Sequence, residues 1–153
     1  MEAKTGYLKA IRKLHLAMLL GQCFMLGAVL FLTIRQTAPP TAASLDKPLQ
    51  VAALLAAFAG VWGGFMIFKK KMLLANAAGN LALKLQEYRQ ALLIQWAITE
   101  AAVLFVIICF FLVGNYSFAA LAIALVIFFA LQTPNKVKLM LHLQLTEQEA
   151  DDL

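Results

Sequence analysis

Residues 91–113, ALLIQWAITEAAVLFVIICFFLV, decide the fold of this chain. The run is predominantly apolar, and a helix needs about 20 apolar residues to cross a bilayer. Its only carboxylate is Glu100, which stands near the middle. A carboxylate in hydrocarbon is energetically costly, so Glu100 is the first candidate for a functional residue.

Three further apolar runs, 14–34, 49–68 and 116–132, flank this segment. The chain has 153 residues and only 14% of them are charged, whereas a soluble domain has about 25%. This length leaves room for one domain. The sequence therefore predicts an all-α fold: an integral membrane four-helix bundle, with helices 14–34, 49–68, 91–113 and 116–132 in a single domain, 1–153.

Basic residues are distributed unevenly between the links that join these runs. Eleven of the 13 Lys and Arg residues fall in the N-terminal segment, the link 69–90 and the C-terminal segment, which four crossings place on one side. The positive-inside rule makes this side the cytoplasm. We therefore expect a multi-pass protein of the bacterial inner membrane with both termini cytoplasmic. The cations expected to contact lipid headgroups are Lys69, Lys70, Lys71, Arg12 and Lys13.

The first run has a second interpretation as a signal peptide. It follows basic residues, and the small residues near Ala43 would permit cleavage. Its apolar core of about 21 residues is longer than the 7–15 of a signal core, which favours a retained helix. Cleavage of this helix stays open at the level of the sequence.

Two cytoplasmic segments carry helical patterns outside the runs. Leucines at helical spacing in 69–90 predict a helical hairpin that turns near 76–80 and is either solvated or a docking surface. In the tail, 134–153, Thr133 is expected to cap a helix that has Pro134 at its first position. We expect this helix to lie on the inner membrane surface.

The two remaining links predict a loop and a tight turn. The link 35–48 contains three prolines and cannot be one continuous helix. Gly114 and Asn115 predict a tight turn that makes an antiparallel hairpin of the third and fourth helices.

Gln22 and Glu100 are the strongly polar residues expected deep inside the helices. At 1.5 Å of rise per residue, Glu100 lies about 15 Å and Gln22 about 12 Å from the inner edge. Because polar groups in hydrocarbon need partners, we predict that the two face each other or share a cavity. The pair would bind an ion or a proton. Alternatively, Glu100 is a neutral carboxyl that joins two helices by a hydrogen bond.

Helix packing is predicted around a glycine pair in the second run. Gly60 and Gly64 form a GxxxG motif, which lets helix backbones approach closely. The motif indicates either simple close packing or a groove that receives the carboxylate. We expect it to be exposed to a partner helix, with Trp62 beside it and with Trp96 near Glu100 on the third helix.

Catalysis and cofactor binding have no support in the sequence. It contains no phosphate loop, nucleophile elbow or zinc signature, so we expect no enzyme, no cofactor and no metal. The net charge of +5 lies beside apolar runs, which indicates lipid contact rather than nucleic acid. Cys23 and Cys109 fall on different helices at different depths and are expected to be free thiols.

Two resemblances rest on the second half of the chain. Glu87, Trp96, Glu100 and the Gly114-Asn115 turn, followed by Thr133-Pro134, make it similar to uncharacterised small four-helix membrane proteins of bacteria, a likeness that implies no activity.

Residues 51–113 also resemble the hairpin of the rotary ATP synthase c subunit. That likeness implies an ion-binding role for Glu100 and a loop role for Arg89 and Gln90. The link between the two helices is longer than in that family, and Arg89 stands closer to the carboxylate.

Two functional hypotheses follow from these patterns. The first is a non-catalytic accessory protein that packs against membrane helices, as a homo-oligomer or as a subunit of a larger assembly. The second is a small proton- or cation-coupled transporter or channel that uses Glu100. An enzyme acting on lipid has no support in the sequence.

Overall fold

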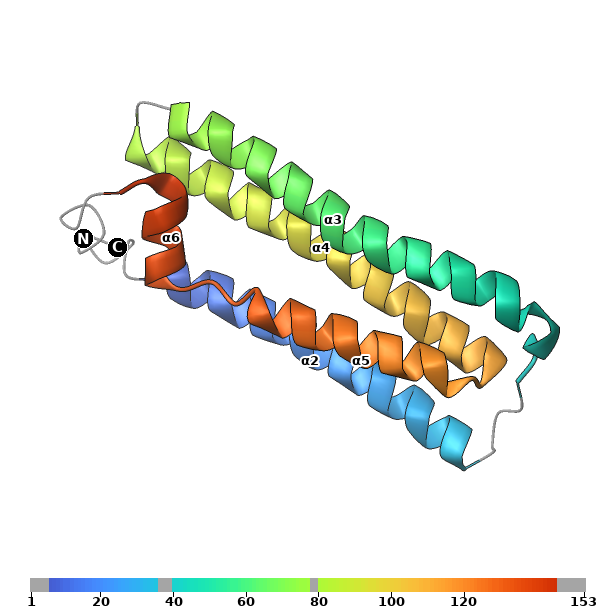
Figure 1. The fold of residues 1–153 in the computed structure, drawn as a ribbon. Coiled ribbons are helices and arrows are strands. Elements are labelled where there is room, and N and C mark those ends of the chain that lie inside the picture. The colour runs from blue at the N-terminus through green and yellow to red at the C-terminus, as the bar shows by residue number, and fades with distance from the viewer. Residues whose placement is uncertain (1–5, 36–39, 78–79, 146–153) are drawn as a thin grey trace.

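The computed structural model describes residues 6–35, 40–77 and 80–145. Its elements are α2 (Tyr7–Ile34), the 3-10 helix η1 (Ala43–Leu45), α3 (Asp46–Ala77), α4 (Leu81–Val113), α5 (Tyr116–Leu131) and α6 (Lys136–Leu143). The predicted all-α class is confirmed, since the described ranges contain helices and no strand. Four helices lie lengthwise beside each other, and α6 crosses one end of the bundle (Figure 1).

Among the described residues, three helical segments are long and apolar enough to cross a membrane: α2, the continuous η1–α3 segment and α4. α5 passes the same test only together with α6, from which it is bent by 76°. α2 and α4 extend beyond the predicted runs on the basic side, and α3 extends on both sides. The predicted hairpin 69–90 is thus formed by the end of α3 and the start of α4. The predicted loop 35–48 is wrong at its end, because η1 and the first residues of α3 are helical and Pro48 stands in the first turn of α3, where proline is tolerated.

Local capping signals set several helix ends. The side chain of Asn80 accepts a hydrogen bond from Ala82 N, and that of Asn115 accepts one from Ser117 N. Gly114 has φ +74°, a left-handed conformation that glycine adopts without strain. These residues explain the turns that the sequence predicts near 76–80 and 114–115; residues 78–79 lie outside the described ranges.

The predicted cap of the tail helix is wrong by two residues. Asn135, not Thr133, caps α6, and its side chain accepts from Lys138 N at 2.7 Å. Thr133 instead donates its hydroxyl to Ala130 O at 2.6 Å. An Asn side chain is at least as good a cap as Thr, so the helix begins after Asn135 and Pro134 stays in the link.

The glycine pair packs α3 directly onto α4, which corrects the expectation of an exposed motif. A Cβ placed on Gly60 would lie 2.6 Å from Ala102 Cβ, and one on Gly64 would lie 3.3 Å from Gln95 O. Both glycines are buried. The GxxxG motif of α3 therefore packs against α4 of the same chain, as expected for close packing. It has no surface left for a partner helix.

Candidate functional site

Glu100 lies on the face of α4 that is turned toward α2. It is 11 residues from both Arg89 and Phe111, and 11 residues make just over three helical turns, so the three residues share one face of α4. Arg89 lines a cavity of about 240 Å³ with residues of α2, and Phe111 lines one of about 220 Å³ with Met25 and Val29 of α2. Glu100 therefore sits halfway along this contact between the helices, which we call the α2–α4 seam.

A ring contact sets the relative depth of Gln22 and Glu100. The rings of His15 on α2 and Trp96 on α4 have centroids 4.7 Å apart. Gln22 is seven residues beyond His15, and Glu100 is four residues beyond Trp96, in helices that run in the same direction. At 1.5 Å per residue the two levels differ by about 4.5 Å, less than one helical turn.

Gln22 and Glu100 were predicted to face each other or to share a cavity, and the described residues show no hydrogen bond between them. Gln22 has 0% exposure, and neither Nε2 nor Oε1 has a hydrogen-bond partner in the described part of the chain. Glu100 is half-buried, and no hydrogen bond or ion pair joins it to the described part of the chain. Gln22 lies in the closed core whereas Glu100 lies on a partly open face, so a similar depth does not bring the groups into contact.

Thr99 and Trp96, the nearest polar side chains on the same turn of α4, make no hydrogen bond to Glu100. Thr99 donates its hydroxyl to Gln95 O at 2.9 Å, one turn back in α4. Trp96 is fully buried, and its Nε1 has no hydrogen-bond partner within the described ranges. Within the described ranges, Glu100 is therefore left without a polar contact.

His15 joins three helices, a role that the sequence analysis did not predict. Its Nε2 lies 3.0 Å from Phe129 O of α5, and its ring stacks on that of Phe129 with centroids 4.7 Å apart. Together with Trp96 of α4 it fills the core between α2, α4 and α5. The signal was present in the helical spacing of Ile11, His15 and Gln22, which are all buried on α2.

The two tryptophans named as packing residues occupy opposite environments. Trp96 has 0% exposure, whereas Trp62 is 58% exposed on the outer surface of α3. Trp62 stacks on Phe58 with centroids 5.9 Å apart. Trp96 therefore packs inside the bundle, and Trp62 belongs to its outer apolar surface.

The cations named for headgroup contact belong to the start of α2 and to the last turns of α3, and both segments lie at the end of the bundle that α6 crosses (Figure 1). Arg12 Nε donates to Pro134 O at 2.9 Å, and Lys71 Nζ lies 3.4 Å from Glu87 Oε2. Lys13, Lys69 and Lys70 are exposed. One end of the molecule thus carries a concentration of positive charge.

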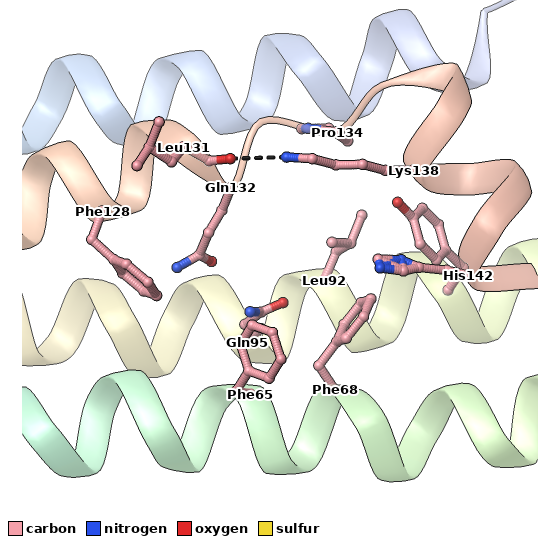
Figure 2. A pocket seen from close by; sticks show the side chains of 11 residues that line it. Phe65, Phe68, Leu92, Gln95, Phe128, Leu131, Gln132, Pro134, Lys138 and His142 are labelled. Carbon is pink, nitrogen blue, oxygen red and sulfur yellow. Dashed lines mark hydrogen bonds between the residues drawn. The ribbon is translucent and has the colours of Figure 1, made fainter.

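A pocket of about 350 Å³ opens where α5 turns into α6, and the sequence analysis missed it (Figure 2). It is lined by side chains of α3, α4, α5 and α6 and by the link before α6. Its polar lining includes Gln95, Gln132, Lys138 and His142. No sequence motif predicts the pocket, because these residues come together only when the helices pack.

Comparison with family models, curated proteins and solved structures gives no match to this chain. The two resemblances stated above therefore stay predictions. The described residues include no cluster of three or more His, Cys, Asp or Glu side chains that could hold a metal ion. Cys23 is exposed and Cys109 is buried, and both are free thiols.

Proposed function

We propose that the protein is an accessory subunit of a homo- or hetero-oligomeric membrane assembly, and that Glu100 is completed by a polar group of another chain. The observation that carries this proposal is the half-buried carboxyl on the α2–α4 seam, which has no partner among the described residues. A polar group in hydrocarbon is stabilised by a hydrogen bond from a neighbouring helix.

The surface beside Glu100 suits close approach by such a helix. Ala97 and Ala101 are both exposed on α4 and are spaced by four residues. Small residues at this spacing allow a second backbone to come near and hydrogen-bond across the contact. We therefore assign the contact with a partner helix to Ala97 and Ala101 and not to Gly60 and Gly64, which are buried within the chain.

The proposed setting is the bacterial inner membrane. α2, α3 and α4 would each cross it, and α5 would make the fourth span, with α6 at the inner surface. The basic end would face the cytoplasm, which places both termini on that side. The concentration of cations beside α6 and the length and apolar character of the three long helices support this topology.

Cysteine crosslinking in native membranes tests the assembly. In a Cys23→Ser background, Ala101→Cys should give a crosslinked product, whereas Ala124→Cys, exposed on α5, should give little. Native mass spectrometry in mild detergent should show a complex that Glu100→Leu weakens. A clean monomer together with no crosslink from Ala101→Cys would refute the proposal.

A proton- or cation-coupled transporter is the second candidate. It is favoured by Gln22, a fully buried amide without a partner at less than one helical turn in depth from Glu100. Flux measured in liposomes should then be lost in Glu100→Gln while the helical content is retained. An unchanged flux in this variant, or none in the parent, removes this candidate.

A further inference from the structure

The pocket at the α5–α6 corner is separate from the α2–α4 seam, and its lining combines apolar and polar side chains, as in small-molecule binding sites. Lys138 and His142 of α6 lie on one side, and Phe65 and Phe68 of α3 lie on another (Figure 2). The bend of 76° between α5 and α6 brings α6 over this space. A volume of about 350 Å³ falls within the roughly 300–1,000 Å³ of small-molecule sites.

The walls of the pocket are apolar, and its mouth is on the outer surface of the bundle. Phe65 is 57% exposed and Leu131 is 71% exposed, while Phe68 and Leu92 are buried behind them. In the proposed topology this mouth faces the lipid close to the cytoplasmic surface. A hydrocarbon chain could therefore enter sideways from the bilayer without crossing water.

Two amides in the pocket have no hydrogen-bond partner among the described residues. Gln95 is 6% exposed, and its side chain makes no hydrogen bond to the described residues. Both amide atoms of Gln132 are buried without a partner. Figure 2 shows the two side chains extending toward the same space. Because buried amides are unfavourable when unpaired, the lining calls for a ligand that supplies hydrogen-bonding oxygens.

The charge of the lining indicates an anionic ligand. Lys138 carries a positive charge at the edge of the pocket, and none of the described residues that line it is a carboxylate. Lys138 Nζ donates to Leu131 O at 2.9 Å and to Thr133 O at 3.1 Å. An ammonium has three donors, so one remains for a ligand while the two carbonyls hold the group in place.

We propose that this pocket binds one acyl chain of an anionic glycerophospholipid from the cytoplasmic leaflet. The chain occupies the space between Phe65, Phe68 and Leu92. The amides of Gln95 and Gln132 donate to the ester oxygens, and Lys138 lies beside the phosphate. The amides supply donors, the ammonium supplies charge, and the aromatic walls exclude water.

Lipid titration of the delipidated full-length protein, followed by native mass spectrometry, tests this site. Phosphatidylglycerol should bind about tenfold more tightly than phosphatidylcholine with the same acyl chains. Lys138→Gln should remove most of this preference. Lys9→Gln removes an equal charge from an exposed position on α2 and should leave the preference unchanged. Equal losses in both variants would show general adsorption to the basic end and would overturn the proposal.

The double variant Gln95→Leu and Gln132→Leu separates a ligand-binding role from a structural one. It should weaken binding of both lipids about tenfold. It should also raise the melting temperature of the lipid-free protein, because it removes the buried, unpaired amide of Gln132. Unchanged lipid binding would overturn the proposal, and so would a lower melting temperature with normal binding.

A photocrosslinking lipid tests the unaltered chain and needs no variant. Phosphatidylglycerol with a diazirine in its acyl chain should label peptides that contain Phe65 and Phe68, or Leu131. Labelling confined to the outer surface around Phe58 and Trp62 would overturn the proposal. The outcome is independent of the assembly proposed above, because the pocket lies wholly within one chain and is measured on the monomer.

Discussion

The α2–α4 seam and the pocket at the α5–α6 corner both leave polar groups without partners, but in opposite ways. At the seam a single acid, Glu100, is half-buried on an outer face. At the corner, neutral amides and one cation line a pocket of about 350 Å³ that opens on the outer surface of the bundle. The first arrangement suits a partner helix, whereas the second suits a small amphiphile. The location of an unpaired polar group, and not its polarity alone, determines what kind of molecule can hydrogen-bond to it.

The residue that holds these two regions in one bundle is expected to give the largest effect. Trp96 has 0% exposure and contacts His15 of α2 and Phe129 of α5. Trp96→Ala should lower the free energy of unfolding by about 3–5 kcal/mol. Denaturant unfolding in detergent measures this loss. Trp62→Ala is the matched control, since Trp62 is 58% exposed and its loss should change stability little.

Separating α3 from α4 should damage the pocket more than the seam. Gly60→Leu forces a side chain against Ala102, whose Cβ would be 2.6 Å from the new Cβ. Overpacking of this kind should cost about 1–3 kcal/mol. Lipid binding at the corner should fall, while crosslinking from Ala101→Cys persists.

Gly63→Ala provides the control for that variant. A Cβ at Gly63 meets nothing within 4 Å, so neither stability nor lipid binding should decrease. Equal stability losses in the two glycine variants would show that the close contact at Gly60 is not what holds α3 on α4.

Neutral replacements of Glu100 should affect association and leave the corner pocket intact. Glu100→Leu should weaken the assembly about tenfold, or about 1.4 kcal/mol, because it removes the group that a partner would bind. Glu100→Gln, which keeps a polar group, should retain more of the association. Analytical ultracentrifugation in detergent measures both. A stronger defect in Glu100→Gln than in Glu100→Leu would contradict the hydrogen-bonding role.

The smallest expected effect is a pH dependence at the corner. Burial, and then the charge of Lys138, lowers the pKa of His142 from its ordinary value of 6.5. The folded protein therefore favours neutral His142, and this contribution to stability is complete above pH 6.5. It should decline as the pH falls below 6.5 through the lowered folded-state pKa.

Melting temperatures of the parent and of His142→Gln measure this contribution. The groups that face His142 from other helices are Phe68 and Tyr88, and Asn76 Nδ2 donates to His142 O. The parent should lose more stability than His142→Gln between pH 7 and pH 5. Parallel losses would show that His142 does not titrate in this way.

Sequence reasoning was most successful where one helix or one turn was sufficient. Asn80, Gly114 and Asn115 act through contacts within a few residues, so their roles could be predicted. Thr133 was misassigned because Asn135, a competing cap, stands two residues away. Gly60 and Gly64 were correctly predicted to pack closely but were assigned to a partner helix, since a GxxxG motif does not specify which helix it receives.

The sequence by itself determined the all-α class, the apolar segments and the concentration of charge at one end. These properties depend on residue type and order along a single helix. The tertiary structure decided which side of α4 Glu100 occupies. It also buried Gln22 away from any hydrogen-bond partner in the described ranges, and it brought Gln95 and Gln132 together at one pocket. The physical reason is that these helices are apolar on nearly every face, so no polar stripe specifies the buried side. Rotation and offset then follow from packing between helices, as at Gly60 against Ala102 and at His15 against Trp96.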